Sequence, residues 1–172
     1  MAGRIDGQEG AVIVKPLTDQ IINKLERVAE LYNRLILVVA PVGSGKTSAL
    51  KAVKERTGAP MINVNLELSR KMLDLTERQR ALQVPQLINE IVTQSNSDVI
   101  LLDNIEILFD TSIKQDPLRL LKGLSRNRTI VATWNGSISK DNITYAVPEH
   151  PEYRKYHVRD FLVASPVAPR QE

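Results

Sequence analysis

The stretch RLILVVAPVGSGKTSAL, residues 34–50, decides the fold. An apolar, strand-like run stops at Pro41, two glycines follow, and Lys46 and Thr47 then open a segment with a helical pattern. A loop without bulky side chains lets several backbone amides point inward around a phosphate, and the next helix adds the positive end of its dipole. The stretch therefore predicts a phosphate-binding loop between a buried strand and a helix.

The residues of this loop have separate expected roles. Lys46 is expected to reach the β- and γ-phosphates, and the Thr47 hydroxyl to bind an Mg²⁺ ion that bridges them. The motif normally begins with glycine; Ala40 stands there, still small enough for a tight turn. No guanine-reading Asn-Lys-x-Asp motif follows the loop, so the sequence predicts ATP and Mg²⁺ as cofactors. The expected phosphate-binding residues are Pro41, Val42, Gly43, Ser44, Gly45, Lys46, Thr47 and Ser48.

Strand-like and helical segments alternate along the chain. The expected strands are 34–40, 61–65, 98–103, 128–135 and 142–147, and the expected helices are 18–32, 45–57, 66–95 and 116–124. Pro85 is expected to divide the third helical segment into two helices, Thr18 or Asp19 to cap the first helix, and Tyr32 to lie on its apolar face. This alternation predicts an α/β P-loop NTPase sandwich of three layers, with a mostly parallel sheet of about five strands.

The domain organisation expected from the sequence is simple. Residues 11–165 read as a single P-loop ATPase domain, with 11–16 as a short strand, and residues 1–10 and 166–172 read as disordered ends. The chain stops soon after the last expected strand, so no AAA+ lid domain is expected.

The 172 residues are 42% hydrophobic with a net charge of +3. Without cysteine, disulfides and thiolate metal sites are excluded. No secretory signal or membrane-length apolar run is present, so a cytoplasmic protein is expected.

Two carboxylates lie at the end of the expected strand 98–103 and just after it. Asp103 is expected to hold Mg²⁺, and it also fits a capping box with Glu106, two roles that are compatible. Many P-loop ATPases carry glutamate directly after this aspartate, but the chain has Asn104, which cannot accept a proton. Glu106 is the nearest carboxylate, and it reads equally well as the group that positions water or as a surface or capping residue. We therefore expect slow hydrolysis, or hydrolysis that needs a partner.

Polar residues also end the expected strand 128–135. Thr133 and Asn135 point to the same face, and because ligands of open α/β sheets bind beyond the carboxyl ends of strands, either is a candidate to hydrogen-bond the γ-phosphate or the attacking water. The alternative for Asn135 is a turn with Gly136.

Several basic residues have two interpretations each. Arg126 and Arg128 flank the start of the strand 128–135, at the end of the sheet opposite the expected nucleotide site, and are interpreted as solvated loop charge or as an arginine finger acting in trans. The segment 148–161 interleaves aromatic and basic residues; it reads as a core-completing strand or as a base-stacking or partner surface. A basic run is interpreted as a solvated helix face, with DNA contact as the alternative; it comprises Arg70, Lys71, Arg78 and Arg80.

These motifs together resemble a known group of proteins. The loop, the segment VILLDNIEILF and the segment IVATWNG resemble ASCE-type ATPases of the AAA+ kind, whose sensor-1 polar residue stands where Thr133 and Asn135 stand. More narrowly, VVAPVGSGKT, LLDNIEILF and TYAVPEHPEYRKY resemble BrxF, the small P-loop component of bacterial BREX phage-defence systems. The resemblance covers about residues 16–165. It implies an ATP-binding assembly or regulatory factor that acts with larger BREX proteins on DNA.

The sequence is also compatible with other functions. The AAA+-like motif order and the expected lack of a lid predict a homo-oligomer promoted by nucleotide. A small-molecule kinase is an alternative, with Arg70, Arg78 and Arg80 closing over a second substrate. A nucleotide-binding switch that does not hydrolyse ATP is another, because no glutamate follows Asp103 directly.

Overall fold

The computed structural model describes residues 16–166, and the expectations for residues 1–15 and 167–172 lie outside this range. The helices are α2 (Leu17–Val28), α3 (Lys46–Thr57), α4 (Val64–Met72), α5 (Glu77–Thr93) and α6 (Pro117–Leu124), with short 3-10 helices η1 (Glu106–Phe109) and η2 (Thr111–Ile113). The strands are β1 (Leu35–Ala40), β2 (Met61–Asn63), β3 (Val99–Asp103), β4 (Thr129–Ser139), β5 (Asn142–Tyr145), β6 (Arg154–His157) and β7 (Leu162–Ala164).

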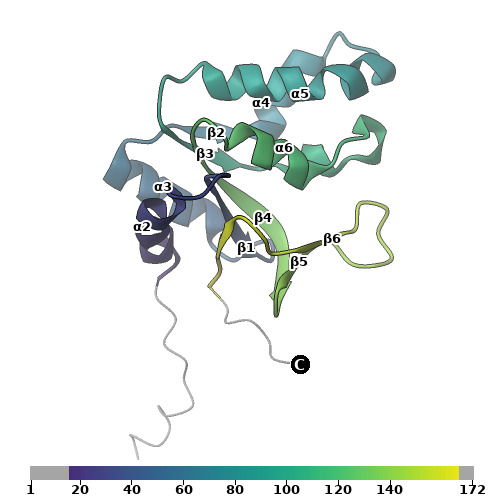
Figure 1. Ribbon diagram of the computed structural model, residues 1–172. Helices are drawn as coiled ribbons and strands as arrows, with labels where there is room; N and C mark the ends of the chain where they lie inside the picture. Colours follow the sequence, from purple (N-terminus) through teal and green to yellow (C-terminus); the bar gives the residue numbers. More distant parts are fainter. Residues whose placement is uncertain (1–15, 167–172) are drawn as a thin grey trace, which may run out of the picture.

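The centre of the molecule is a parallel sheet with strand order β2-β3-β4-β1-β7. β4 runs beyond this sheet and pairs antiparallel with β5, which pairs in turn with β6, so that a hairpin extends from the sheet (Figure 1). The expected mostly parallel sheet is therefore confirmed. The short strand β7 on β1 and the antiparallel extension make it larger than the sequence predicted.

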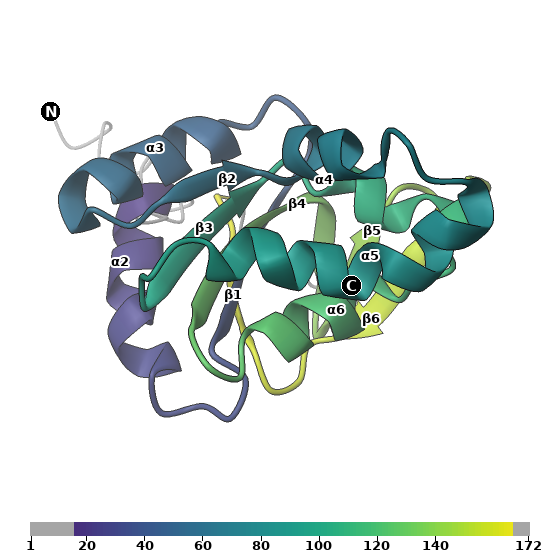
Figure 2. The same cartoon turned by 90° about the horizontal axis from the view of Figure 1, so that it is seen from above.

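Helices cover both faces of the sheet, as Figures 1 and 2 show: α2 and α3 lie on one side, and α4, α5 and α6 on the other. β1 is buried throughout, and successive side chains point to opposite faces. Leu35, Leu37 and Val39 join the core under α4–α6, whereas Ile36 and Val38 join the core under α2 and α3. The three-layer α/β architecture is thus confirmed.

Two details of the first helix differ from expectation. α2 ends at Val28, and the Tyr32 side chain is 75% exposed rather than packed on the apolar face. The N-cap residue is Pro16, with no side-chain cap, so the predicted capping by Thr18 or Asp19 is wrong.

The helical segment after β2 is divided at a different place from the one predicted. Thr76 starts α5 with a capping box to Gln79, so the break lies between α4 and α5, and Pro85 is inside α5. Pro85 has no N–H for the carbonyl of Ala81, which instead accepts a hydrogen bond from the Gln115 side chain at 2.9 Å. Tertiary contact therefore replaces the missing helical bond.

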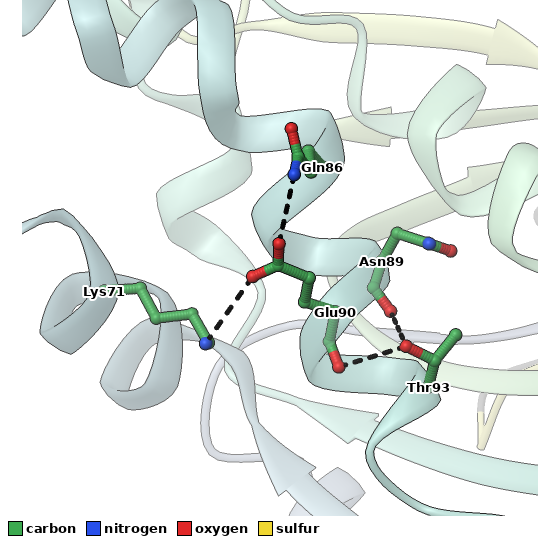
Figure 3. A network of polar contacts seen from close by, with 5 residues as sticks. All are labelled: Lys71, Gln86, Asn89, Glu90 and Thr93. Atoms are coloured by element: carbon green, nitrogen blue, oxygen red, sulfur yellow. Dashed lines mark hydrogen bonds and ion pairs between the residues drawn. The ribbon is translucent and has the colours of Figure 1, made fainter.

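A polar network ties α4 to α5 on the surface (Figure 3). Glu90 of α5 faces α4: the Lys71 ammonium of α4 is 3.8 Å from one carboxylate oxygen, and the Gln86 amide, one turn earlier in α5, donates to the other at 3.2 Å. The Thr93 hydroxyl donates to the carbonyls of Asn89 and Glu90, which closes the last turn of α5. Lys71, from the basic run, is thus engaged with Glu90.

Candidate nucleotide-binding site

The loop between β1 and α3 has the conformation that its glycines predict. Gly43 and Gly45 have φ of 80° and 84°, a left-handed region that residues with a Cβ rarely adopt, and Gly45 is the N-cap of α3. Residues 41–45 are exposed. Within the described chain, no hydrogen bond is donated by the backbone amides of residues 42–45. The loop therefore presents amide hydrogens at the positive end of a helix.

The Lys46 side chain is folded back against the start of this loop. Its ammonium donates to the carbonyls of Ala40 at 2.8 Å and Pro41 at 2.7 Å, and the residue is only 6% exposed. Burial lowers the pKa of this ammonium, while the charges of Glu106 and Asp103 oppose part of the shift. A cation held at this position faces the two carboxylates of the site.

Asp103 connects the loop to the centre of the sheet. One carboxylate oxygen accepts a hydrogen bond from the Thr47 hydroxyl at 2.8 Å, and the other accepts one from the Thr133 hydroxyl at 2.8 Å. Asp103 is 4% exposed and ends β3. It does not form the expected capping box with Glu106, because η1 has Ile105 as its N-cap and no side-chain cap. The two threonines take up both oxygens of Asp103 instead.

Glu106 lies across the site from Asp103 and is held by two side-chain amides. Asn65 donates to one carboxylate oxygen at 2.9 Å, and Asn135 donates to the other. Asn104, with φ of 51°, turns the chain after β3 through a left-handed conformation that asparagine tolerates. The interpretation of Asn135-Gly136 as a turn is wrong, because both residues lie within β4. Asn135 therefore meets Glu106.

Asn65 is a site residue that the sequence analysis missed. β2 ends beside β3, with Asn63 paired to Asp103, so the first turn of α4 starts at the same edge of the sheet. The Asn65 side-chain oxygen also accepts the N–H of Ile107 at 2.8 Å, which fixes the amide orientation. The signal available in the sequence is a polar residue at the end of the expected strand 61–65; the structure ends β2 at Asn63 and places Asn65 in α4.

These residues surround a cavity of about 300 Å³ at the carboxyl ends of the parallel strands. Its lining comprises Val42, Gly43, Gly45, Lys46, Thr47, Asp103, Asn104, Glu106, Thr133 and Asn135. Most of the site residues expected from the sequence are thus brought together. Pro41, Ser44 and Ser48 belong to the loop and helix but not to this lining.

An aromatic cluster packs behind the cavity-lining residues Thr133 and Asn135. Trp134 lies between Thr133 and Asn135 in β4; its indole N–H donates to the carbonyl of Thr144 at 3.1 Å, and its ring is 5.0 Å from Phe109, edge to face. Phe109 also stacks on Tyr145. Burial raises the pKa of Tyr145 to about 12, with Glu152 and Glu106 adding to the shift, so its hydroxyl stays neutral. Trp134 is therefore a packing residue.

The two arginines before β4 differ in their surroundings. Arg128 donates to the carbonyls of Val92 at 3.1 Å and Ser95 at 3.2 Å, where it closes the end of α5. Arg126 is exposed and lies 5.8 Å from the ring of Tyr32. Both stand near the amino ends of the strands, away from the cavity, as the sequence predicted.

The segment 148–161 contributes to the hydrophobic core. Phe161 is 4% exposed, and Tyr156 packs against the same core on β6. The Tyr156 hydroxyl donates to Asp116 at 2.9 Å, and Arg154 donates to the carbonyl of Gln115 at 3.2 Å.

Within residues 16–166, no three histidine, aspartate or glutamate side chains cluster as a metal site. No helix in this part of the chain is long and apolar enough to cross a membrane.

Comparison with known proteins agrees with this geometry. Residues 36–138, more than half of the chain, match the family AAA, "ATPase family associated with various cellular activities". The chain therefore belongs to the AAA family of ATPases. No match was found among curated protein sequences.

Two solved structures are similar to the chain. "Structure of C. elegans PCH-2" is 20% identical with a TM-score of 0.42, over 76% of this chain and 39% of that one. "Crystal structure of DNA replication initiation factor" is 19% identical with a TM-score of 0.41, over 73% of this chain and 40% of that one. The chain spans about two fifths of the length of these structures.

Proposed function

We propose that the chain binds Mg-ATP in the cavity beyond β1, β3 and β4 and hydrolyses it slowly. The observation that carries this proposal is the pair of 2.8 Å hydrogen bonds that place Thr47 and Thr133 on the two oxygens of Asp103. They join the loop, which offers unbonded amides, to a buried carboxylate at the strand ends. The loop amides and Lys46 would hold the phosphates.

The donor set fits Mg²⁺. Thr47 supplies a hydroxyl and Asp103 a carboxylate, 2.8 Å apart, and Mg²⁺ in nucleotide sites takes one or two such protein ligands and completes its octahedron with phosphate oxygens and water. When bound, the ion neutralises phosphate charge. Thr133 holds the second oxygen of Asp103 and so orients the carboxylate.

Slow hydrolysis follows from the state of Glu106. Both of its carboxylate oxygens accept amide hydrogens, from Asn65 and Asn135. An attacking water therefore has to compete with an amide for either oxygen before the charge of Glu106 can orient and polarise it. Asn135, which bonds to Glu106 and lines the same cavity, is a second candidate to orient the attacking water. A partner that displaces one amide would free an oxygen of Glu106 and speed the reaction.

The kinase alternative has less support. Of the three arginines that would close over a second substrate, Arg80 donates to the carbonyls of Met72 and Leu75 at 3.1 Å, and Arg70 faces Glu67 at 3.4 Å. Only Arg78 is without a partner among the described residues, so the three do not form a free lid. The nucleotide-binding switch would use the same site and would differ from the proposed ATPase only in having a hydrolysis rate of zero.

Phosphate release from Mg-ATP tests the proposal. We expect slow release without any added acceptor and none from Lys46→Met. Turnover that appears only with an added nucleoside or metabolite would instead show a kinase.

The cellular role is proposed from the sequence resemblance to BrxF. We propose a cytoplasmic, nucleotide-dependent assembly component of a BREX phage-defence system that self-associates when it binds ATP. Light scattering after size exclusion, with and without Mg-ATP, is expected to show a mass increase with the nucleotide. An unchanged monomer would contradict self-association, and a gene neighbourhood without a BREX methyltransferase would contradict the BREX role.

A further inference from the structure

Two hollows lie on either side of α6, away from the nucleotide cavity. One, of about 750 Å³, lies between α5 and α6; the other, of about 310 Å³, lies between α6, Asn33 and Tyr156. They share Arg119 and Arg126, so they form one continuous surface over α6. Figures 1 and 2 both show α5 and α6 on the face of the sheet opposite α2 and α3, and Tyr156 of β6 reaches the start of α6 through its hydrogen bond to Asp116.

Four cations line this surface, which we call the α6 basic surface: Lys114, Arg119, Lys122 and Arg126. Among residues 16–166, none of the four lies in an ion pair. The lining holds a single carboxylate, Asp116, whose oxygen already accepts the N–H of Arg119 and the hydroxyl of Tyr156. The surface therefore carries an excess of three positive charges, equal to the net charge of the whole chain.

An exposed aromatic ring stands beside these cations. Tyr32 is 75% exposed, and the Arg126 guanidinium lies 5.8 Å from its ring centroid. Lys122 lies over the ring of Phe161 at 5.5 Å, which holds its charge close to the surface. Cations that follow a phosphate backbone, next to an aromatic face on which a base can stack, are the chemistry of single-stranded nucleic-acid binding.

We propose that the α6 basic surface binds single-stranded nucleic acid, with the four cations on phosphates and Tyr32 stacking on a base. A duplex fits less well, because α6 has only eight residues and lies beside α5, so it cannot enter a major groove. An acidic peptide would use the charges but leaves the exposed ring of Tyr32 without a role. The proposal is independent of ATP binding, since the surface shares no residue with the nucleotide cavity.

The test is fluorescence anisotropy with labelled dT20, a 20-base-pair duplex and a poly-glutamate peptide, at 50 and 200 mM salt. Four phosphate contacts on a single strand predict a loss of dT20 affinity of about 50-fold between the two salt concentrations. The variant Arg119→Gln/Lys122→Gln/Arg126→Gln is expected to weaken dT20 binding at low salt and to reduce the salt slope by about 2. Lys46→Met is expected to bind dT20 like the wild type.

A matched control removes the same charge elsewhere. Arg27→Gln/Lys51→Gln/Lys54→Gln changes exposed cations on α2 and α3, on the opposite side of the sheet, and is expected to keep wild-type binding and salt slope. Tyr32→Ala is expected to weaken dT20 binding by about 5-fold or more without changing the slope, whereas Tyr32→Phe keeps it. Circular dichroism checks that each variant is folded, and Mg-ATP binding gives a second check for the α6, control and Tyr32 variants.

Three results would overturn the proposal. The first is equal loss of dT20 binding, or no loss, in the α6 and control triple variants. The second is tighter binding of the duplex than of dT20. The third is poly-glutamate binding as tight as dT20 together with no effect of Tyr32→Ala, which would assign the surface to an acidic protein.

Discussion

Asn65 and Glu106 are 41 positions apart in the sequence, yet the Asn65 amide donates to the Glu106 carboxylate at 2.9 Å. The contact exists because β2 and β3 are neighbours in the sheet and their carboxyl ends meet. It places an amide, rather than water, on one oxygen of the residue we assign to water positioning. The two amides therefore fix the orientation of Glu106 and, at the same time, occupy the carboxylate oxygens that a water would use.

The first prediction concerns the charge of Glu106. In Glu106→Gln, the new amide oxygen can accept from Asn65, whose orientation is fixed by the N–H of Ile107, while Asn135 can rotate its amide to accept. The fold is thus preserved, and we expect ATP affinity close to wild type with turnover reduced about 100-fold. Steady-state phosphate release and nucleotide titration measure the two effects. Normal turnover in this variant would remove Glu106 from the mechanism.

The second prediction concerns the anchor of Glu106. Asn65→Ala removes one hydrogen bond to a carboxylate and leaves the Ile107 N–H without its acceptor. Losses of this kind cost about 2–4 kcal/mol in the free energy of unfolding. Urea unfolding compares the variant with Asn127→Ala, which changes an exposed turn residue. A loss of stability no larger than that of the control would show that the contact is not structural.

The third prediction concerns the metal. Asp103→Asn keeps an oxygen and an amide with which Thr47 and Thr133 can bond, so the fold is expected to survive. It removes the negative charge that favours Mg²⁺, so adding Mg²⁺ is expected to improve ATP affinity in the wild type but hardly at all in the variant. Nucleotide titrations with and without EDTA measure this. An equal Mg²⁺ effect in both proteins would place the ion elsewhere.

The fourth prediction concerns the hairpin behind the site. A Cβ at Gly136 would lie 1.7 Å from the carbonyl oxygen of Thr144, so Gly136→Ala must push β4 and β5 apart. We expect a marked fall in the melting temperature and weaker ATP binding, because Asn135 is the preceding residue. Gly123→Ala is the matched control: it has open space in α6 and should raise stability by up to about 1 kcal/mol. Equal melting temperatures for the two variants would be inconsistent with this close approach.

The sequence predicted the parts of the site that depend on local pattern. The glycine loop, the strand ending in Asp103, and Thr133 with Asn135 on one face all follow from spacing within a few residues. The contact between Asn65 and Glu106 depends on which strands are neighbours, and local periodicity does not carry that information. The same holds for Pro85, whose helix-breaking effect is overcome by Gln115, 30 positions further along the chain, through its bond to Ala81.

Calorimetry with Mg-ATP on the wild type and on Lys46→Met tests the central claim most directly. The free loop amides and Lys46, already held beside the two carboxylates, predict saturable binding in the wild type. In Lys46→Met, the loss of charge-assisted hydrogen bonds is expected to weaken affinity about 100-fold. No heat from any magnesium nucleoside triphosphate, or equal affinity in the two proteins, would contradict the account.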